Sequence, residues 1–277
     1  MTIAVIGASG RIGRRVVAGL AARGLETWAI GRTPARMPAF GAGVRPGLEA
    51  TLAGARVVVS CVHARFAARI LAALPPGVER VVLLGSTRCH TRFPDRAAEE
   101  VRAAERALRA SPVAGVILHP TMIYGGDGEN NVQRIAQLIR RFGMLLLPAG
   151  GASLLQPIHA ADVAACVIQA AVNDTARGAI VLAGPEPVTQ AEFMRAIARA
   201  IGRRVVIIPA PLALMRVAAA LMRAIPGLPR IENAEILRLT EDKDFPIADM
   251  TTILGVRPRG LAQGLRETFS PATPPAG

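Results

Sequence analysis

A short apolar run that ends abruptly in glycine stands at Ile3–Gly13, IAVIGASGRIG. The spacing G-x-x-G-x-x-G, between a predicted strand and a predicted helix, is typical of a turn that holds a pyrophosphate. Side chains at the three glycines would keep the phosphate from the backbone, whose N–H groups at the helix N-terminus attract it. A dinucleotide is therefore predicted to contact Gly7, Ala8, Ser9, Gly10, Arg11, Ile12 and Gly13.

Four more apolar runs, rich in valine and isoleucine, follow this one. They have the composition of strands buried on both faces of a parallel sheet, and they cover Thr27–Ile30, Val57–Cys61, Val81–Leu84 and Gly115–Leu118. Helical patterns separate several of them, at Arg11–Arg23, Ala64–Leu74 and Arg96–Arg109. This alternation predicts an α/β fold of the Rossmann type, a doubly wound parallel sheet.

The pattern loosens after residue 125. We predict a nucleotide-binding core over residues 1–125 and a mixed region over residues 126–277. The second region is expected to supply the last core elements and a small C-terminal α/β lobe for a substrate or partner. Its predicted elements are a helix near Asn131–Phe142, a strand at Ala179–Ala183 and a helix at Thr189–Ile201.

Composition limits the function classes. The 33 basic and 20 acidic side chains give a net charge of +13, but the arginines are spread along the chain and only 3% of residues are aromatic. Nucleic-acid binding is therefore not predicted, and the charge favours an anionic ligand. The three cysteines, Cys61, Cys89 and Cys166, form no CxxC pair, so neither a disulfide framework nor a metal site is predicted. Residues 1–17 lack a signal-peptide pattern, and a cytoplasmic location is expected.

The choice of dinucleotide depends on the end of the second strand, which reads WAIGRTPARM. NAD-binding proteins carry an acidic residue there for the ribose hydroxyls, whereas this chain has Gly31 and Arg32. A guanidinium at Arg32, with Arg36 as a second contact, would bind the 2′-phosphate of NADP. NADP(H) is therefore preferred. NAD(H) is the alternative, with Arg32 stacked on the adenine.

Further segments carry a resemblance to a known family. They are VVVSCVHA at 57–64, VVLLGSTR at 81–88, ILHPTMIYGGDGENN at 117–131, LQPIHAADVAACV at 155–167, LAGPEPVTQAEFMRAIARAIGR at 182–203 and LGVRPRGLAQGL at 254–265. Together with GASGRIG they resemble the short-chain dehydrogenase/reductase superfamily over nearly the whole chain. The similar branches are the extended and atypical ones, with epimerase/dehydratase-like proteins, NmrA-like proteins and the accessory subunit of respiratory complex I.

The resemblance implies roles for residues at the ends of the strands. Ser60–His63, with Cys61, Val62 and His63, would line the adenosine and ribose. Ser86 and Thr87 would flank the nicotinamide, and Pro120–Tyr124, with Pro120 and Thr121 at its start, would close over the far side. Gln156, His159 and Asp162 would belong to the loop and helix that brace the substrate lobe.

The usual catalytic pair of this family is missing. It consists of a tyrosine and a lysine four residues apart on one helix, where the ammonium lowers the pKa of the phenol. Here the only tyrosine is Tyr124 and the only lysine is Lys243, and the corresponding helix carries Arg92 and Arg96, or Ala97 and Val101, instead. Arginine stays protonated and is no substitute acid.

Other side chains are candidates for the missing function. Thr87 would orient a substrate carbonyl, and Tyr124 lies beside the nicotinamide in the resemblance, so these two are the predicted catalytic residues. His63 and His90 have a suitable intrinsic pKa for acid–base work. For Tyr124 a packing role, and for His90 a solvent-exposed loop, are the alternatives, whereas His119 and His159 are expected to be structural.

Two function classes follow. The first is an NADPH-dependent reductase of a small apolar carbonyl or enone-type substrate, in which binding and hydride geometry supply most of the acceleration. The second is a non-catalytic NADP(H)-binding sensor or structural accessory subunit of a redox complex. The apolar segment Pro211–Pro226 is too short to span a bilayer. It is either a core or lid helix, or a helix that docks on a protein partner or membrane surface.

Overall fold

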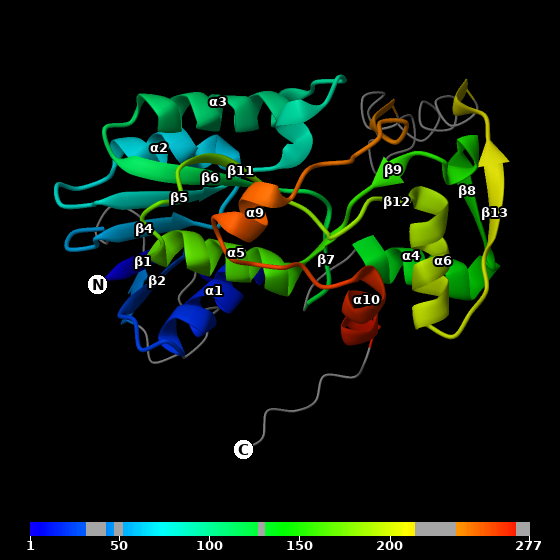
Figure 1. The fold of residues 1–277 in the computed structure, drawn as a ribbon, viewed down its shortest axis with the longest axis horizontal. Coiled ribbons are helices and arrows are strands. Elements are labelled where there is room, and N and C mark those ends of the chain that lie inside the picture. Colours follow the sequence, from blue (N-terminus) through cyan, green and yellow to red (C-terminus); the bar gives the residue numbers. More distant parts are fainter. Residues whose placement is uncertain (32–42, 47–51, 127–130, 214–236, 270–277) are drawn as a thin grey trace, which may run out of the picture.

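The computed structural model describes residues 1–31, 43–46, 52–126, 131–213 and 237–269, and within 43–46 only the backbone. A seven-stranded sheet forms its larger part (Figure 1). All its strand pairs are parallel, in the order β11-β6-β5-β4-β1-β2-β3. The strands are β1 (Ile3–Ile6), β2 (Thr27–Gly31), β3 (Gly43–Pro46), β4 (Val57–Ser60), β5 (Arg80–Leu84), β6 (Ala114–Pro120) and β11 (Gly178–Leu182). The predicted Rossmann-type sheet is confirmed.

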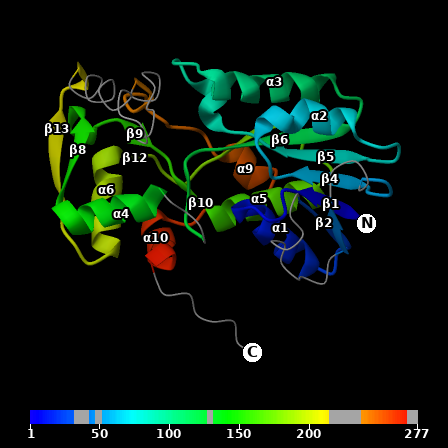
Figure 2. The same cartoon turned by 180° about the vertical axis from the view of Figure 1, so that it is seen from behind.

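Helices cover both faces of this sheet. One layer holds α1 (Arg11–Ala21) and α5 (Ala160–Val172), and the other holds α2 (Ala67–Ala72) and α3 (Arg96–Ala110), as Figures 1 and 2 show. Two apolar cores result, because strand residues alternate between the faces: Ile3 and Val5 pack toward α1 and α5, whereas Ala4 and Ile6 belong to the opposite core. Such two-sided burial explains why the strands read as continuous apolar runs.

The strand order reverses between β1 and β4. From β1 the chain proceeds through β2 to β3 on one side, and from β4 through β5 and β6 to β11 on the other. In an open parallel sheet, ligands bind at the carboxyl ends of the strands beside such a reversal. These ends point toward the smaller lobe (Figure 1).

The smaller lobe has its own apolar core. It contains α4 (Asn131–Phe142), α6 (Gln190–Ala200) and α10 (Leu261–Phe269), with a parallel pair of strands, β8 (Met144–Pro148) and β13 (Val206–Ala210). Ile139, Phe193 and Leu265 are among the buried residues that the three helices contribute. The predicted helices at Asn131–Phe142 and Thr189–Ile201 are confirmed, but β8 and β13 were not predicted, because half of their side chains face solvent and their pairing is non-local.

Residues after 125 also complete the large sheet. The predicted strand at Ala179–Ala183 is β11, which pairs with β6, and α5 packs along α1. Two short ladders lie between the lobes: β7 (Ile123–Tyr124) with β10 (Ile158–His159), and β9 (Leu154–Leu155) with β12 (Val188–Thr189). The chain therefore passes between the two lobes more than once.

The C-terminal part of the described chain links the two lobes through polar contacts. Gln156 donates from Nε2 to the carbonyls of Gly184 (2.8 Å) and Phe245 (3.2 Å), and its Oε1 accepts the N–H of Phe245 at 2.8 Å. Asp162 on α5 accepts the Nε and Nη2 groups of Arg259, each at 3.0 Å, and the Arg259 N–H at 3.1 Å. Gln156 lies in the loop before α5, His159 is the N-cap of that helix and Asp162 lies in its first turn, while the bracing of a substrate lobe stays a prediction.

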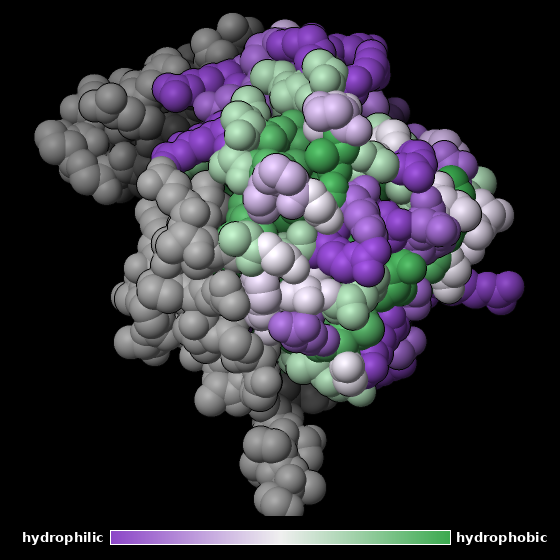
Figure 3. Space-filling view, turned by 90° about the vertical axis from the view of Figure 1, so that its left-hand side faces the viewer, coloured by the Kyte–Doolittle hydropathy of each residue, from purple (hydrophilic) through white to green (hydrophobic). Residues whose placement is uncertain are grey.

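The segment Pro211–Pro226 falls outside the described residues from position 214 onward. Among the helices that the structure describes, none has the length and apolarity to cross a bilayer. The end of the molecule at the amino ends of the strands shows hydrophilic and hydrophobic residues side by side wherever its atoms are coloured (Figure 3).

Asp162→Asn is expected to lower the free energy of unfolding by about 3 kcal/mol, because it removes the more buried of the two carboxylates, Asp162 and Glu267, that pair with the half-buried Arg259 guanidinium. The side chains of Asp162 and Arg259 are 7% and 23% exposed, which places the effect at the lower end for buried ion pairs. Asp249→Asn, on the exposed side of α9 (Ala248–Thr252), is the matched control and should stay within about 0.5 kcal/mol. Urea unfolding measures both. Equal stability of the two variants would contradict this role for Asp162.

Candidate functional site

The glycine turn lies at the carboxyl end of β1, next to the strand-order reversal. Gly7 and Ala8 donate their N–H groups to the Ile30 carbonyl at 2.9 and 3.2 Å, and Gly10 donates to the Gly7 carbonyl at 2.9 Å. Gly7 has a φ of +82°, which side-chain-bearing residues rarely adopt. Helix α1 begins directly after Gly10, and no described side chain caps it.

The three glycines fit a bound pyrophosphate, each for a separate reason. A Cβ at Gly7 would lie 2.7 Å from Val62 Cγ1, and one at Gly10 would lie 3.2 Å from the Gly7 carbonyl oxygen. A Cβ at Gly13 would overlap that same carbonyl, so glycine at this position lets α1 approach the turn. The uncapped helix start then presents its N–H groups, with no acidic residue in its first turn, to an anion.

The residues after β4 form the neighbouring wall. Cys61 donates its N–H to the Ile6 carbonyl at 2.9 Å, so the β4 end is held against the β1 end. Burial raises the pKa of the Cys61 thiol to about 12, which keeps it protonated. His63 is exposed, and its Nδ1 lies 3.5 Å from Glu100 Oε2 on α3. The structure thus brings Val62 and His63 to the same edge as the glycine turn.

The residues after β5 lie at the next strand along. Ser86 accepts the Arg88 N–H on its hydroxyl at 3.2 Å and so caps the short helix Thr87–His90. Thr87 is half-buried, and its hydroxyl donates to the Pro120 carbonyl at 3.4 Å, a long hydrogen bond. Thr121 in turn donates its hydroxyl to the Gln156 carbonyl. Ser86, Thr87, Pro120 and Thr121 therefore gather at adjacent strand ends, and their contact with a nicotinamide stays a prediction.

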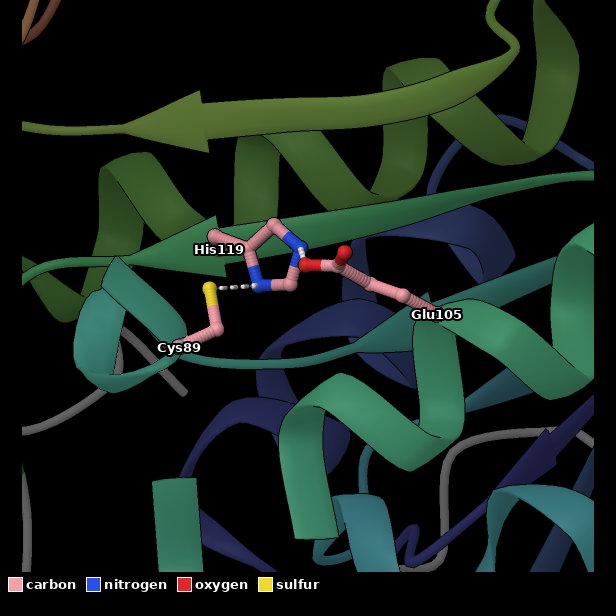
Figure 4. A group of neighbouring side chains, drawn as sticks. All are labelled: Cys89, Glu105 and His119. Atoms are coloured by element: carbon pink, nitrogen blue, oxygen red, sulfur yellow. Dashed lines mark hydrogen bonds and ion pairs between the residues drawn. The ribbon is translucent and has the colours of Figure 1, made fainter. Parts of the chain in front are cut away.

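A buried histidine supports this strand end from behind. His119 on β6 accepts the Ser86 N–H on Nδ1 at 3.1 Å, and its Nε2 lies 2.9 Å from Glu105 Oε1 (Figure 4). Cys89 Sγ lies 3.8 Å from the same Nδ1. Burial lowers the pKa of His119, and burial together with Glu105 raises the pKa of the Cys89 thiol to about 12. Cys89 and Glu105 face different ring nitrogens of His119. We therefore interpret the three side chains as a hydrogen-bonded group and not as the ligands of one metal ion.

Tyr124 is turned away from this edge into the smaller lobe. It is 1% exposed, its ring meets the His159 ring edge-on at a centroid distance of 5.3 Å, and its hydroxyl occupies the space that a Cβ at Gly264 on α10 would need. Burial, with the nearby Asp162 carboxylate, raises the pKa of Tyr124 above its usual value. This environment favours the packing role over proton donation.

The comparisons with known proteins agree with this geometry. A family model described as NAD(P)H-binding matches residues 7–174. The chain belongs to this NAD(P)H-binding family. The matched residues run from the glycine turn to just beyond the end of α5, and so include every described strand end discussed above.

Solved structures share the fold of this NAD(P)H-binding protein. The NADPH-dependent quinone oxidoreductase QOR2 of Escherichia coli, complexed with NADPH, aligns with a TM-score of 0.76 at 21% identity over 95% of this chain and 98% of that one. UDP-N-acetylglucosamine 4-epimerase from Bacillus cereus aligns with a TM-score of 0.73 at 14% identity over 97% of this chain and 98% of that one. UDP-glucose 4-epimerase of Thermus thermophilus, in complex with NAD, aligns with a TM-score of 0.69 at 20% identity over 97% of each chain. At these identities the likeness shows the fold, and the neighbours include both cofactors.

Curated relatives add the sequence similarity without an activity. An uncharacterized protein of Mycobacterium tuberculosis (strain ATCC 25618 / H37Rv) is 29% identical over 230 residues, which are 76% of this chain and 24% of the relative. An uncharacterized protein of Mycobacterium bovis gives the same values. The chain thus spans about a quarter of the length of the curated relatives that it matches.

The arginines predicted to select NADP(H) are not part of the described structure. Strand β2 ends at Gly31, and Arg32 and Arg36 lie outside the described residues. Their role stays a prediction.

Helix α3 is where the resemblance places the missing catalytic pair, although Arg92 precedes this helix, which begins at Arg96. Arg96 is exposed and pairs with Glu100 at 3.0 Å, and Val101 is buried in the core. Cys89 Sγ and the His90 ring both contact His119, the ring edge-on at a centroid distance of 6.0 Å. His90 is exposed and also packs its ring against Phe245 at a centroid distance of 5.8 Å. Helix α3 carries neither a tyrosine nor a lysine; its carboxylates Glu100 and Glu105 instead lie 3.5 Å from His63 Nδ1 and 2.9 Å from His119 Nε2.

Sequence reasoning missed the segment 238–245, which packs against residues 91–95 after the Thr87–His90 helix. Glu241 is 6% exposed and accepts the Thr91 hydroxyl and the Arg92 N–H, each at 2.6 Å. Arg238 binds Asp95 at 2.7 Å. These contacts span about 150 positions of sequence, and the acidic run EDKD that contains Glu241 reads like an ordinary solvated loop. No local signal separates Glu241 from its neighbours.

Gly7→Ala is expected to weaken NADPH binding at least tenfold, because the added methyl group meets Val62 and the backbone must leave its left-handed conformation. Fluorescence titration with NADPH measures the effect. Gly24→Ala is the matched control, since Gly24 has a φ of +71° with no atom within 4 Å of its Cβ position. It shares the backbone strain but lies at the far end of α1, so its NADPH affinity should equal that of the wild type. Tight NADPH binding by Gly7→Ala would contradict the assignment of the turn.

Proposed function

We propose that the protein is an NADPH-dependent reductase of a small apolar carbonyl or enone-type substrate, with quinones the best-matched class. The observation that carries this proposal is the chemistry at the carboxyl ends of the strands. The uncapped glycine turn after β1 and the Thr87 hydroxyl after β5 lie at the same edge of the sheet, with β4 between their strands, while the one tyrosine of the chain is buried away from that edge. The likeness in fold to the NADPH-dependent quinone oxidoreductase of Escherichia coli supports the same class.

The missing acid limits which substrates suit the site. Bound NADPH supplies a hydride. Transfer to a simple ketone leaves a localised alkoxide, which needs a proton donor in the transition state. Transfer to a quinone or an enone leaves a delocalised phenolate or enolate, which is far less basic and takes its proton from water afterwards. A site that holds a hydroxyl donor but no positioned acid therefore matches quinones and enones best.

Thr87 is the residue proposed to contact the substrate oxygen. Its hydroxyl is only weakly engaged by the Pro120 carbonyl at 3.4 Å, so it can turn to donate to a developing oxyanion. Ser86 holds the start of the Thr87–His90 helix and is itself held by His119, which fixes the Thr87 backbone. Apolar residues of the smaller lobe would cover the rest of the substrate.

Thr87→Val is expected to lower kcat with a quinone or enone by about 10- to 100-fold, because it removes the hydrogen bond to the oxyanion. The Kd for NADPH should not change, since the substitution leaves the glycine turn intact. Tyr124→Phe is the matched comparison: it removes a hydroxyl that faces Gly264, and kcat should change less than threefold or so if Tyr124 only packs. Stopped-flow oxidation of NADPH separates the two variants. The reverse ranking would make Tyr124 the catalytic residue.

Arg32→Glu tests the cofactor preference. The substitution is expected to weaken NADPH binding by at least about tenfold while NADH binding stays equal or improves, because the 2′-phosphate then meets a carboxylate. Arg23→Glu, an exposed change of the same charge after α1, is the control and should leave the ratio of the two affinities unchanged. Unaltered NADPH affinity in Arg32→Glu would show that Arg32 does not bind the 2′-phosphate.

A non-catalytic NADP(H)-binding sensor or structural subunit is the second candidate. The observation that favours it is the burial of Tyr124 and His119, since neither side chain is exposed at the strand ends. A panel of quinones, enones and aldehydes with bound NADPH distinguishes the two. Oxidation of NADPH by a member of the panel supports the reductase, and tight binding without turnover supports the second candidate.

A further inference from the structure

The paired strands β8 and β13 present an apolar face to solvent. They are parallel and in register, with Met144 opposite Val206 and Leu146 opposite Ile208. These four outward side chains are 46%, 63%, 57% and 36% exposed, in the same order. We call the surface that they form the β8–β13 face. It lies at the end of the smaller lobe farthest from the seven-stranded sheet, as Figures 1 and 2 show.

The other side of the same two strands is an ordinary buried side. Leu145 on β8 and Val205, directly before β13, pack against the core of the smaller lobe. Strand residues alternate between two sides, so a sheet with one wet side normally carries polar residues there. Here both sides are apolar, which is uncommon at a protein surface and marks a binding surface.

Two pairs of arginines stand at one end of this face. Arg140 and Arg141 precede β8, and Arg203 and Arg204 precede β13. Because the strands are parallel, and Val206 donates its N–H to the Gly143 carbonyl at 2.9 Å, both pairs lie at the same end. All four are exposed, and among the described residues no carboxylate forms an ion pair with any of them.

The elements around the face carry the same sign of charge. Residues 131–151 hold three arginines and no acidic residue, and residues 190–210 hold four arginines and one glutamate. The two segments together therefore carry a formal charge of +6 (seven arginines less one glutamate). An apolar surface beside arginines without ion pairs is complementary to a partner that has a negatively charged surface and an apolar interior.

We propose that the β8–β13 face docks on the surface of an anionic phospholipid bilayer. Met144, Leu146, Val206 and Ile208 enter the region below the headgroups, and the two arginine pairs bind lipid phosphates. Arginine suits this position because its stem lies along apolar surface while its head reaches the phosphate. A second copy of this chain fits less well, since it would bring another net charge of +13 to a face already rimmed by arginines.

Vesicle flotation of the full chain tests the proposal. Binding is expected to vesicles that contain phosphatidylglycerol, with little binding to pure phosphatidylcholine, and it should fall as salt rises. Arg140→Gln with Arg203→Gln should weaken binding at least tenfold, from about fivefold per arginine. Arg106→Gln with Arg109→Gln, two exposed arginines on α3, removes the same charge elsewhere and is the matched control, with at most a small loss.

Two further variants test insertion. Leu146→Ser with Val206→Ser should weaken binding at least tenfold in the same vesicles, because less apolar surface enters the bilayer. Leu146→Trp should show a blue-shifted tryptophan emission when phosphatidylglycerol vesicles are added. Three results would each overturn the proposal. They are equal binding to both lipids, an equal loss of binding in the Arg140/Arg203 variant and the Arg106/Arg109 control, and unchanged binding in the serine variant. A dimer in sedimentation equilibrium that Leu146→Glu dissociates would also overturn it and assign the face to a second copy.

Discussion

The approach of α1 to the glycine turn is the contact on which the rest of the structure depends. No Cβ fits between Gly13 and the Gly7 carbonyl, so the helix begins against the turn and aims its N–H groups at the strand-order reversal. The same helix meets α5 just as closely at Gly19, where a Cβ would overlap Ile168. Helix α5 carries Asp162, whose ion pair with Arg259 positions the chain before α10. Close helix packing and the Asp162–Arg259 ion pair thus connect the glycine turn to the smaller lobe.

Burial decides which of the polar groups near the strand ends can act. His119 and Tyr124 are held in low-polarity surroundings, where the pKa of the imidazole falls and that of the phenol rises. Both then stay neutral and serve as hydrogen-bond or packing partners. The hydroxyl of Thr87 remains at the edge as a donor without a neighbouring base. The reductase that we propose would therefore depend on the geometry of hydride transfer and on an acceptor whose reduced form is a weak base.

The carboxyl ends of the sheet strands, where we expect the cofactor, and the β8–β13 face occupy different parts of the molecule. The first lies where the large sheet meets the smaller lobe, and the second at the far end of that lobe (Figure 1). Their charge serves different ends in our proposals: Arg32 and Arg36 select a phosphate on a small ligand, and Arg140 and Arg203 meet a surface. These proposals thus give local roles to four of the basic side chains that make up the net charge of +13.

Local sequence pattern was enough to predict the Rossmann-type sheet, because buried parallel strands have continuous apolar sequences. It also predicted the strand ends of the candidate site, because the glycine motif is typical of a turn that binds a phosphate. Absence of the tyrosine–lysine pair was likewise plain from composition. Tertiary structure alone placed Glu241 beside Thr91, turned Tyr124 toward Gly264 and paired β8 with β13. These contacts join residues far apart in sequence, and no short window contains both partners. The sequence by itself therefore determined the fold and the cofactor turn, whereas the burial of the candidate acids and the exposed apolar face were decided by long-range packing.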